Sequence, residues 1–170
     1  MKKTLILYSK RGPYDELYTP IEAVEPIVPF LPKEWTWWEP TDFGDSQITR
    51  CLKASGFKIF GTCQTEIDFL TSLPQRPFDA IITNPPYSLK DEFLARAYEI
   101  KKPFCFLLPI TTLEGIKRGK MFREHGLQVA VLDRRVNFLH HKKRVWFNTS
   151  WFCWKILPKD LIFLEVKRRG

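Results

Sequence analysis

The order of predicted elements constrains the fold of this 170-residue chain more than any other sequence feature. Short apolar segments that predict strands alternate with amphipathic segments that predict helices. The strands are 36–38, 57–60, 78–83 and 103–109, and the helices are 21–28, 47–55, 89–100 and 113–125. The tail holds only strand-like segments, at 128–132, 145–147 and 150–157. This pattern predicts a doubly wound, mostly parallel α/β sheet that ends in a C-terminal antiparallel hairpin.

Local signals set the expected limits of these elements. Thr19-Pro20 is typical of a helix start, with Thr19 as the cap. Ser88 is expected to cap the helix that follows it, and Gly126 to end the next one. Residues 67–70 are expected to be a short extended piece.

Composition excludes several classes of protein. Hydrophobic residues make up 44% and charged residues 27%, which is enough to bury a core. No apolar run approaches the ~20 residues of a membrane span, and the apolar stretch near the start is too brief for a signal peptide. The four cysteines are widely scattered and the three histidines lack zinc-ligand spacing. We expect a single cytoplasmic domain over 1–170, with reduced thiols and no metal.

Positive charge is concentrated between Gly115 and Trp146. The chain carries a net charge of +8, and this segment supplies +7 of it from nine basic and two acidic residues. Such a patch attracts the phosphates of nucleic acids, and an aromatic at its end can stack on a base. A solvated face that only aids solubility is the other interpretation. The predicted nucleic-acid contacts are Lys117, Arg118, Lys120, Arg134, Arg135, Lys142, Lys143, Arg144 and Trp146.

The tetrapeptide Asn84-Pro85-Pro86-Tyr87 directly follows the clearest predicted strand. An open α/β sheet places its ligands at the carboxyl ends of its strands. The Asn84 side-chain oxygen and a proline-bound carbonyl can both accept N–H bonds from a planar amine, which frees the nitrogen lone pair for attack. Pro85 and Pro86 fix these acceptors in advance, and Tyr87 offers a ring for a base to stack on. An ordinary turn that stops a strand is the alternative.

In these residues the chain resembles the class I S-adenosylmethionine-dependent methyltransferases with an N-P-P-Y motif, the adenine-N6 group. The segment Asn84 to Asp91, Asn-Pro-Pro-Tyr-Ser-Leu-Lys-Asp, is similar to small phage-encoded members. The resemblance covers about residues 14–157. It implies a Rossmann-like fold, S-adenosyl-L-methionine as cofactor, and transfer of a methyl group to the N6 of adenine in DNA or RNA.

The same resemblance implies roles for residues outside this motif. Tyr18-Thr19-Pro20 looks like the motif beside the methionine end of the donor, and Glu39-Pro40 looks like the end of the first strand, whose acid faces the same group. Asp68-Phe69 corresponds to the pair that holds the donor's adenine. The turn after Glu39 has one glycine where the family has a G-x-G loop, so polar contacts are expected from Asp42 or Asp45 and from the Ser46 amide. The alternative is that Asp42, Asp45 and Asp68 serve only as turn and cap residues.

Two other functions stay open at this point. The missing G-x-G loop favours a methyltransferase-fold protein that has lost the donor and binds nucleic acid or a host protein. N-P-P-Y also occurs in enzymes that methylate a glutamine amide. No target-recognition domain is visible, so we expect weak sequence specificity. The sequence leaves the oligomeric state open.

Overall fold

A single seven-stranded sheet organises the computed structural model, which describes residues 17–138 and 145–167. Its strand order is β2-β1-β3-β4-β6-β5-β7. The strands β2, β1, β3 and β4 run parallel, β6 is antiparallel to both of its neighbours, and β7 pairs in parallel with β5. The bounds are β1 Thr36–Glu39, β2 Lys58–Gly61, β3 Ala80–Thr83, β4 Phe104–Pro109, β5 Gln128–Leu132, β6 Thr149–Trp154 and β7 Leu161–Leu164. The predicted mostly parallel α/β sheet with an antiparallel hairpin is confirmed.

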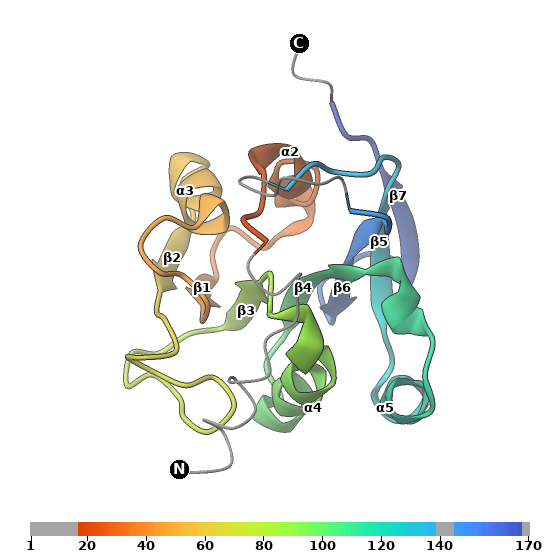
Figure 1. Ribbon diagram of the computed structural model, residues 1–170. Helices are drawn as coiled ribbons and strands as arrows, with labels where there is room; N and C mark the ends of the chain where they lie inside the picture. The colour runs from red at the N-terminus through yellow and green to blue at the C-terminus, as the bar shows by residue number, and fades with distance from the viewer. Residues whose placement is uncertain (1–16, 139–144, 168–170) are drawn as a thin grey trace.

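Helices cover both faces of this sheet. Figure 1 shows α2 and α3 on one face and α4 and α5 on the other. The Trp151 indole reaches the carbonyl of Ala23 in α2, whereas the adjacent Phe152 packs on Phe122 in α5. The α-helices are α2 Ile21–Val24, α3 Gln47–Ala54, α4 Lys90–Ile100 and α5 Ile116–His125, and 3₁₀ helices span Val28–Phe30, Tyr87–Leu89 and Ile110–Leu113. None of the helices within the described ranges has the length and apolar character to span a membrane.

The core lies along the central strands. All six residues of β4 are buried, as expected for a strand covered on both faces. Trp37, Trp38 and Trp151 are fully buried, and each indole N–H has an oxygen acceptor within the fold. Cys51, Cys105 and Cys153 are buried and Cys63 is only partly covered, and none of the four forms a disulfide.

The chain reverses its direction of winding between β1 and β3. From β1 it moves outward to β2, then returns to pair β3 with the opposite side of β1. Since these strands are parallel, Glu39, Gly61 and Thr83 end at the same edge of the sheet. A switch point of this kind is where doubly wound sheets hold their ligands.

Two of the predicted helix caps are wrong. Pro20, not Thr19, is the N-cap of α2, and no side chain caps that helix. Ser88 lies inside the 3₁₀ helix Tyr87–Leu89, and Leu89 takes the N-cap position of α4. In both places a proline sets the backbone angles of the entry, so the polar residue beside it is not needed as a cap.

Three strand assignments also need correction. Residues 67–70 form turns, since the Asp68 carbonyl accepts the N–H groups of Thr71 and Ser72. Residues 145–147 are not a strand, because Val145 and Phe147 are buried without joining the sheet. The edge strand β7 was not predicted, because four apolar residues after Pro158-Lys159-Asp160 give only a short signal.

Candidate functional site

The side chain of Asn84 lies at the switch point with its amide held in one orientation. Its Nδ2 donates to the carbonyl of Leu17 at 2.8 Å, which fixes the side of the amide that carries the oxygen. Its Oδ1 is buried and has no hydrogen-bond partner among the described residues. A buried acceptor of this kind costs free energy unless a donor arrives from outside. Asn84 therefore holds an acceptor that a ligand N–H can satisfy once the atoms that cover this oxygen move aside.

Behind Asn84, three oxygens from two neighbouring strands form a closed triangle. Glu39 Oε1 lies 2.8 and 2.6 Å from the hydroxyl oxygens of Thr41 and Thr83, which are 2.6 Å from each other. The Thr41 hydroxyl also lies 3.5 Å from the Asn84 carbonyl oxygen. Three mutual contacts need three protons, of which the two hydroxyls supply two. A proton on the Glu39 carboxyl completes the triangle.

Burial explains why Glu39 can hold that proton near neutral pH. The side chain is 1% exposed, and burial raises its pKa from 4.5 to about 7. Hydrogen bonds from Thr83 and Thr41 oppose the rise in pKa, and the charge of Asp42 adds to it. Perturbed carboxyls at the ends of strands are typical of functional sites.

The turn between β1 and α3 is organised by Asp42. Its Oδ1 accepts the N–H groups of Gly44 and Ser46 at 2.7 and 3.1 Å. Ser46 in turn caps α3 by accepting the N–H of Thr49. Gly61 in β2 leaves room for the Asp42 side chain, since a Cβ there would lie 2.3 Å from Asp42 Oδ2. Asp45 is exposed at the tip of the turn.

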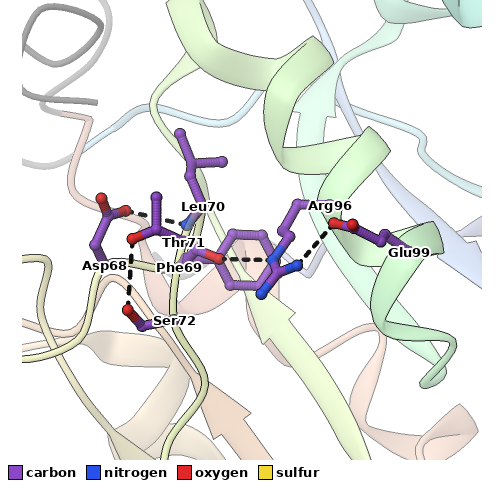
Figure 2. Close-up of polar contacts among 7 residues, drawn as sticks. All are labelled: Asp68, Phe69, Leu70, Thr71, Ser72, Arg96 and Glu99. Carbon is purple, nitrogen blue, oxygen red and sulfur yellow. Dashed lines mark hydrogen bonds and ion pairs between the residues drawn. The ribbon is translucent and has the colours of Figure 1, made fainter. Parts of the chain in front are cut away.

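The next loop carries Asp68 and Phe69, which face opposite ways. The Asp68 carboxylate accepts the N–H of Leu70 at 3.0 Å and is half-buried. The Phe69 ring is 1% exposed and stacks on Phe93 of α4 at 4.7 Å. Figure 2 shows the Phe69 carbonyl accepting from Arg96, which fastens the loop to α4. Asp68 is thus the polar group of the pair, and the Phe69 side chain belongs to the core.

The segment before α2 meets the Asn84 loop directly. The Leu17 carbonyl is the acceptor of the Asn84 amide, so residues 17–20 lie beside the switch point. Thr19 and Pro20 are buried, whereas Tyr18 is 45% exposed. The structure therefore brings the predicted residues Tyr18, Thr19 and Pro20 next to the predicted loop.

Tyr87 is inside the protein. Its side chain is 7% exposed, and its ring meets the edges or faces of Phe138 and Phe147 at 6.5 and 5.7 Å. Its hydroxyl is buried without a partner among the described residues, and burial raises its pKa well above 10. In this conformation the ring is not an open stacking platform, because Phe138 and Phe147 cover it.

The basic residues divide into one that is built into the fold and several that are exposed. Among the exposed ones, Lys120 and Arg134 lie 3.8 Å from Glu124 and Asp133, and Arg135 donates to Asn148 Oδ1 at 3.3 Å. Arg118 is built into the fold: it forms an ion pair with Asp91 at 2.6 Å and donates to the carbonyls of Thr112 and Glu114. Lys117, Lys120, Arg134 and Arg135 are exposed, and Trp146 is 64% exposed. The predicted contacts Lys142, Lys143 and Arg144 lie outside the described residues.

The described parts of the connection between β5 and β6, residues 133–138 and 145–148, lie at the same edge of the sheet as Asn84. The strand β5 ends at that edge, and the Asn148 carbonyl just before β6 accepts the N–H of Ile110, which follows β4. Phe138 and Phe147, from the two ends of this connection, both contact Tyr87. Arg134, Arg135 and Trp146 are therefore within the connection that borders the candidate site.

Sequence reasoning missed the supporting groups Thr41, Thr83 and the Leu17 carbonyl. Two of them had a readable signal: Thr83 immediately precedes Asn84, and Thr41 comes two residues after Glu39. Because the carboxyl ends of adjacent parallel strands lie side by side, the polar residues that follow β1 could have been predicted to contact those at the end of β3. The Leu17 carbonyl had none, because a backbone group 67 positions away leaves no trace in side-chain types.

Solved structures with the same fold are methyltransferases. The chain is similar to the methyltransferase subunit of a type I restriction-modification system from Streptococcus thermophilus, with a TM-score of 0.57 and 16% identity over 87% of this chain and 46% of that chain. It is also similar to a modification subunit of a putative type I restriction enzyme from Vibrio vulnificus, with a TM-score of 0.52 and 13% identity over 99% and 51%. The chain thus spans about half the length of both.

A third structure is covered more fully. It is a putative class I S-adenosylmethionine-dependent methyltransferase from Listeria monocytogenes, with a TM-score of 0.53 and 12% identity over 98% of this chain and 72% of that chain. No protein-family model matches the sequence, and the comparison with curated proteins gives no match. At these identities the likeness establishes the fold, which is the Rossmann-like fold of these methyltransferases.

Proposed function

We propose that this protein transfers the methyl group of S-adenosylmethionine to the exocyclic N6 of adenine in DNA or RNA. The observation that carries the proposal is the buried, unpartnered Oδ1 of Asn84 at the switch point of the sheet. The shared methyltransferase fold supports methyl transfer. The restriction-modification systems named for two of the structures favour a nucleic-acid acceptor.

The chemistry of the acceptor explains why an oxygen is needed there. The lone pair of an adenine amine is delocalised into the ring, so the nitrogen is a poor nucleophile. Hydrogen bonds from both of its N–H groups to fixed oxygens favour a tetrahedral nitrogen with its lone pair free. Asn84 Oδ1 supplies one oxygen. The Pro86 carbonyl already accepts the N–H of Leu89, so the Pro85 carbonyl is our candidate for the second.

The residues present fit a donor that combines a nucleoside with cationic groups. When bound, S-adenosylmethionine supplies an electrophilic methyl on a sulfonium. Glu39 provides a carboxyl beside the switch point, and Asp68 provides a second acid on the next loop. Residues 18–20 lie on a further side of the switch point, next to Asn84. We propose that Tyr18-Thr19-Pro20 holds the methionine end and Asp68 the nucleoside end, with Pro40, Asp45 and Ser46 lining the turn. Glu39, which is buried, supports the switch point from behind through Thr41 and Thr83.

The nucleic acid would lie along the connection between β5 and β6. Arg134 and Arg135 are exposed there, and Trp146 offers a ring to a base. Since Phe138 and Phe147 cover Tyr87, stacking of the target base on Tyr87 requires these rings to move apart. Lys117 and Lys120 can add phosphate contacts from α5.

One observation favours a second candidate, a protein that keeps the fold and binds nucleic acid without a donor. Asp42 occupies both the Gly44 and Ser46 amides, so the turn uses within itself the N–H groups that a glycine-rich loop would offer to a ligand. The two candidates differ in donor binding, which is directly measurable.

Calorimetric titration with S-adenosylmethionine separates them. We expect the unmodified protein to bind the donor and Asp68→Ala to bind it at least about tenfold more weakly, since a charged hydrogen-bond partner is lost. Asp160→Ala, which removes an acid just before β7, is the matched control and is expected to bind normally. Absence of binding by the unmodified protein would favour the second candidate.

A further inference from the structure

Two cysteines lie directly opposite each other on neighbouring strands near the centre of the sheet. Cys105 of β4 is in register with Cys153 of β6, and both residues are completely buried. Residues in register on paired strands point to the same face of the sheet, because the pleats of the two strands are aligned. The two thiols therefore lie side by side inside the core, although their residues are far apart in the chain.

The two cysteines occupy the kind of pair that brings side chains closest together. The N–H of Ile110 donates to the carbonyl of Asn148 at 2.8 Å, so these opposite residues, just beyond the β4–β6 ladder, form a hydrogen-bonded pair. Hydrogen-bonded and non-hydrogen-bonded pairs alternate along an antiparallel ladder. Cys105 and Cys153 are an odd number of positions away and are therefore a non-hydrogen-bonded pair. The Pro103 carbonyl agrees with this, because it faces β3, and Cys105 two residues later directs its backbone groups to the same side.

The spacing of such a pair suits a disulfide bond. The Cα atoms of a non-hydrogen-bonded pair lie about 4.5 Å apart, within the range of about 4.4–6.8 Å that is usual in disulfides. The two thiols already interact: burial raises the pKa of the Cys105 thiol well above its usual range, and its hydrogen bond to Cys153 and the charge of Cys153 add to the rise. Joining the two sulfurs removes two hydrogens and adds no atom, so the bond forms without overpacking the core.

We infer that Cys105 and Cys153 form an oxidation site, which a small disulfide such as glutathione disulfide converts to a cross-strand disulfide bond. One cysteine thiolate attacks the oxidant, forms a mixed disulfide and releases one glutathione thiol. The second cysteine sulfur then attacks the mixed disulfide and releases the other glutathione thiol. In sum, the two S–H bonds are lost, one S–S bond forms, and the two electrons and two protons reduce the oxidant to two thiols.

Burial determines when this exchange takes place. A glutathione attached to either sulfur has no room in the folded core, and a buried thiol is a poor nucleophile. The exchange therefore takes place while β4 and β6 are apart, and folding selects the intramolecular disulfide among the possible products. The partly covered Cys63 is expected to exchange in the folded protein instead. The buried pair thus retains the redox state in which the chain folds.

Refolding from urea in glutathione buffers of stepped composition tests this inference on the unmodified protein. After thiol alkylation, peptide mapping by mass spectrometry is expected to find Cys105 linked to Cys153 as the main disulfide. We expect the equilibrium constant for this link against glutathione to be roughly 100-fold or more larger in native buffer than in urea, because folding holds the two sulfurs together. By the same linkage, the oxidised protein is expected to unfold at a higher urea concentration than the reduced protein.

Two variants control for other pairings. Cys63→Ser, at the partly covered cysteine, is the matched control and is expected to form the same link, whereas Cys153→Ala is expected to lose it. Three results would overturn the inference: an equilibrium constant no larger in native buffer than in urea, a refolded protein in which Cys105 or Cys153 is mainly linked to another cysteine or to glutathione, or an oxidised protein less stable than the reduced one. The candidate active site lies between β1 and β3, so donor binding is a separate measurement and its failure leaves this test unaffected.

Discussion

At the scale of single residues, the site depends on a buried oxygen of the partly buried Asn84 and on the fully buried Glu39, which have different roles. Asn84 holds an oxygen ready for a partner from outside, and Glu39 joins two strand ends through Thr41 and Thr83. The tetrapeptide in the sequence pointed to Asn84, because only a few residue types can offer a fixed acceptor. It did not point to the triangle behind Asn84, which depends on how β1 and β3 pair.

The raised pKa of Glu39 predicts a specific pH dependence of stability. Between pH 4.5 and about 7 the folded state holds a proton that the unfolded state has lost, so the free energy of unfolding falls as pH rises through this range. The expected fall is roughly 3 kcal/mol at most, from the size of the shift. Glu39→Gln keeps the accepting oxygen and removes the titration. Urea denaturation from pH 4 to 8 checks this, and equal pH slopes in the two proteins would contradict it.

The Tyr87 hydroxyl, which has no partner among the described residues, predicts that its removal does not destabilise the protein. Removing a buried hydroxyl that has no partner relieves its desolvation cost, so Tyr87→Phe is expected to be as stable as the unmodified protein or up to about 1 kcal/mol more stable. Tyr87→Ala removes the ring that meets Phe138 and Phe147 and is expected to cost about 3–5 kcal/mol. Thermal unfolding of both variants distinguishes a hydroxyl kept for a ligand from one that supports the fold, for which Tyr87→Phe would be destabilised.

At the scale of elements, the spacing of apolar residues and the glycine and proline residues that end helices and strands predicted most of the sheet. The strands β1, β3, β4 and β5 and the helices α3, α4 and α5 lie within a few residues of their expected limits. The strand predicted at 145–147 is wrong. Val145 and Phe147 are buried on alternate positions, which is typical of a strand, but Phe147 packs on Tyr87 instead of joining a ladder. The cap predictions at Thr19 and Ser88 are wrong because Pro20 and Pro86 already set the backbone angles at these helix starts. Local sequence cannot show which tertiary contact a buried residue makes.

The turn after β1 depends on Gly61 in β2, because any side chain there would contact Asp42. Gly61→Ala places a Cβ 2.3 Å from Asp42 Oδ2, so the carboxylate must leave the Gly44 and Ser46 amides. We expect a loss of about 1–3 kcal/mol in stability and weaker donor binding. In an Asp42→Gly background the same change is expected to cost much less, because the whole Asp42 side chain is gone, including the Cβ that would lie 2.5 Å from the new one. Additive costs in this double-mutant cycle, measured by urea denaturation, would contradict the coupling.

Two neighbouring basic residues near the junction of α4 and α5 have different roles: Arg118 supports the fold, whereas Lys117 is a surface charge. Arg118 links Asp91 in α4 to the carbonyls of Thr112 and Glu114, so Arg118→Met is expected to cost about 1–2 kcal/mol through the loss of these hydrogen bonds, since water can partly solvate the 32% exposed Asp91. The exposed neighbour Lys117 is the matched control, and Lys117→Met is expected to change stability by less than about 0.5 kcal/mol. Equal unfolding midpoints for the two variants would show that Arg118 is as dispensable as a surface charge.

At the scale of the whole molecule, the parallel strands gather residues 17–20, Glu39 and Asn84 near one edge of the sheet, although they are far apart in the chain. The sequence could predict this edge because the strand order follows from the alternation of elements. The connection from β5 to β6 adds exposed basic residues at the same edge. Fold, acceptor and charge are therefore consistent with one reaction on a nucleic acid.

Identification of the methylated nucleoside tests this account most directly. Mixed-sequence duplex DNA, single-stranded DNA and tRNA would each be incubated with the protein and isotope-labelled S-adenosylmethionine, digested to nucleosides and analysed by mass spectrometry. We predict label in N6-methyladenosine or its deoxy form, and a loss of roughly 100-fold or more in rate for folded Asn84→Ala. Label in another nucleoside, or an undiminished rate in Asn84→Ala, would contradict the proposed role of the Asn84 oxygen.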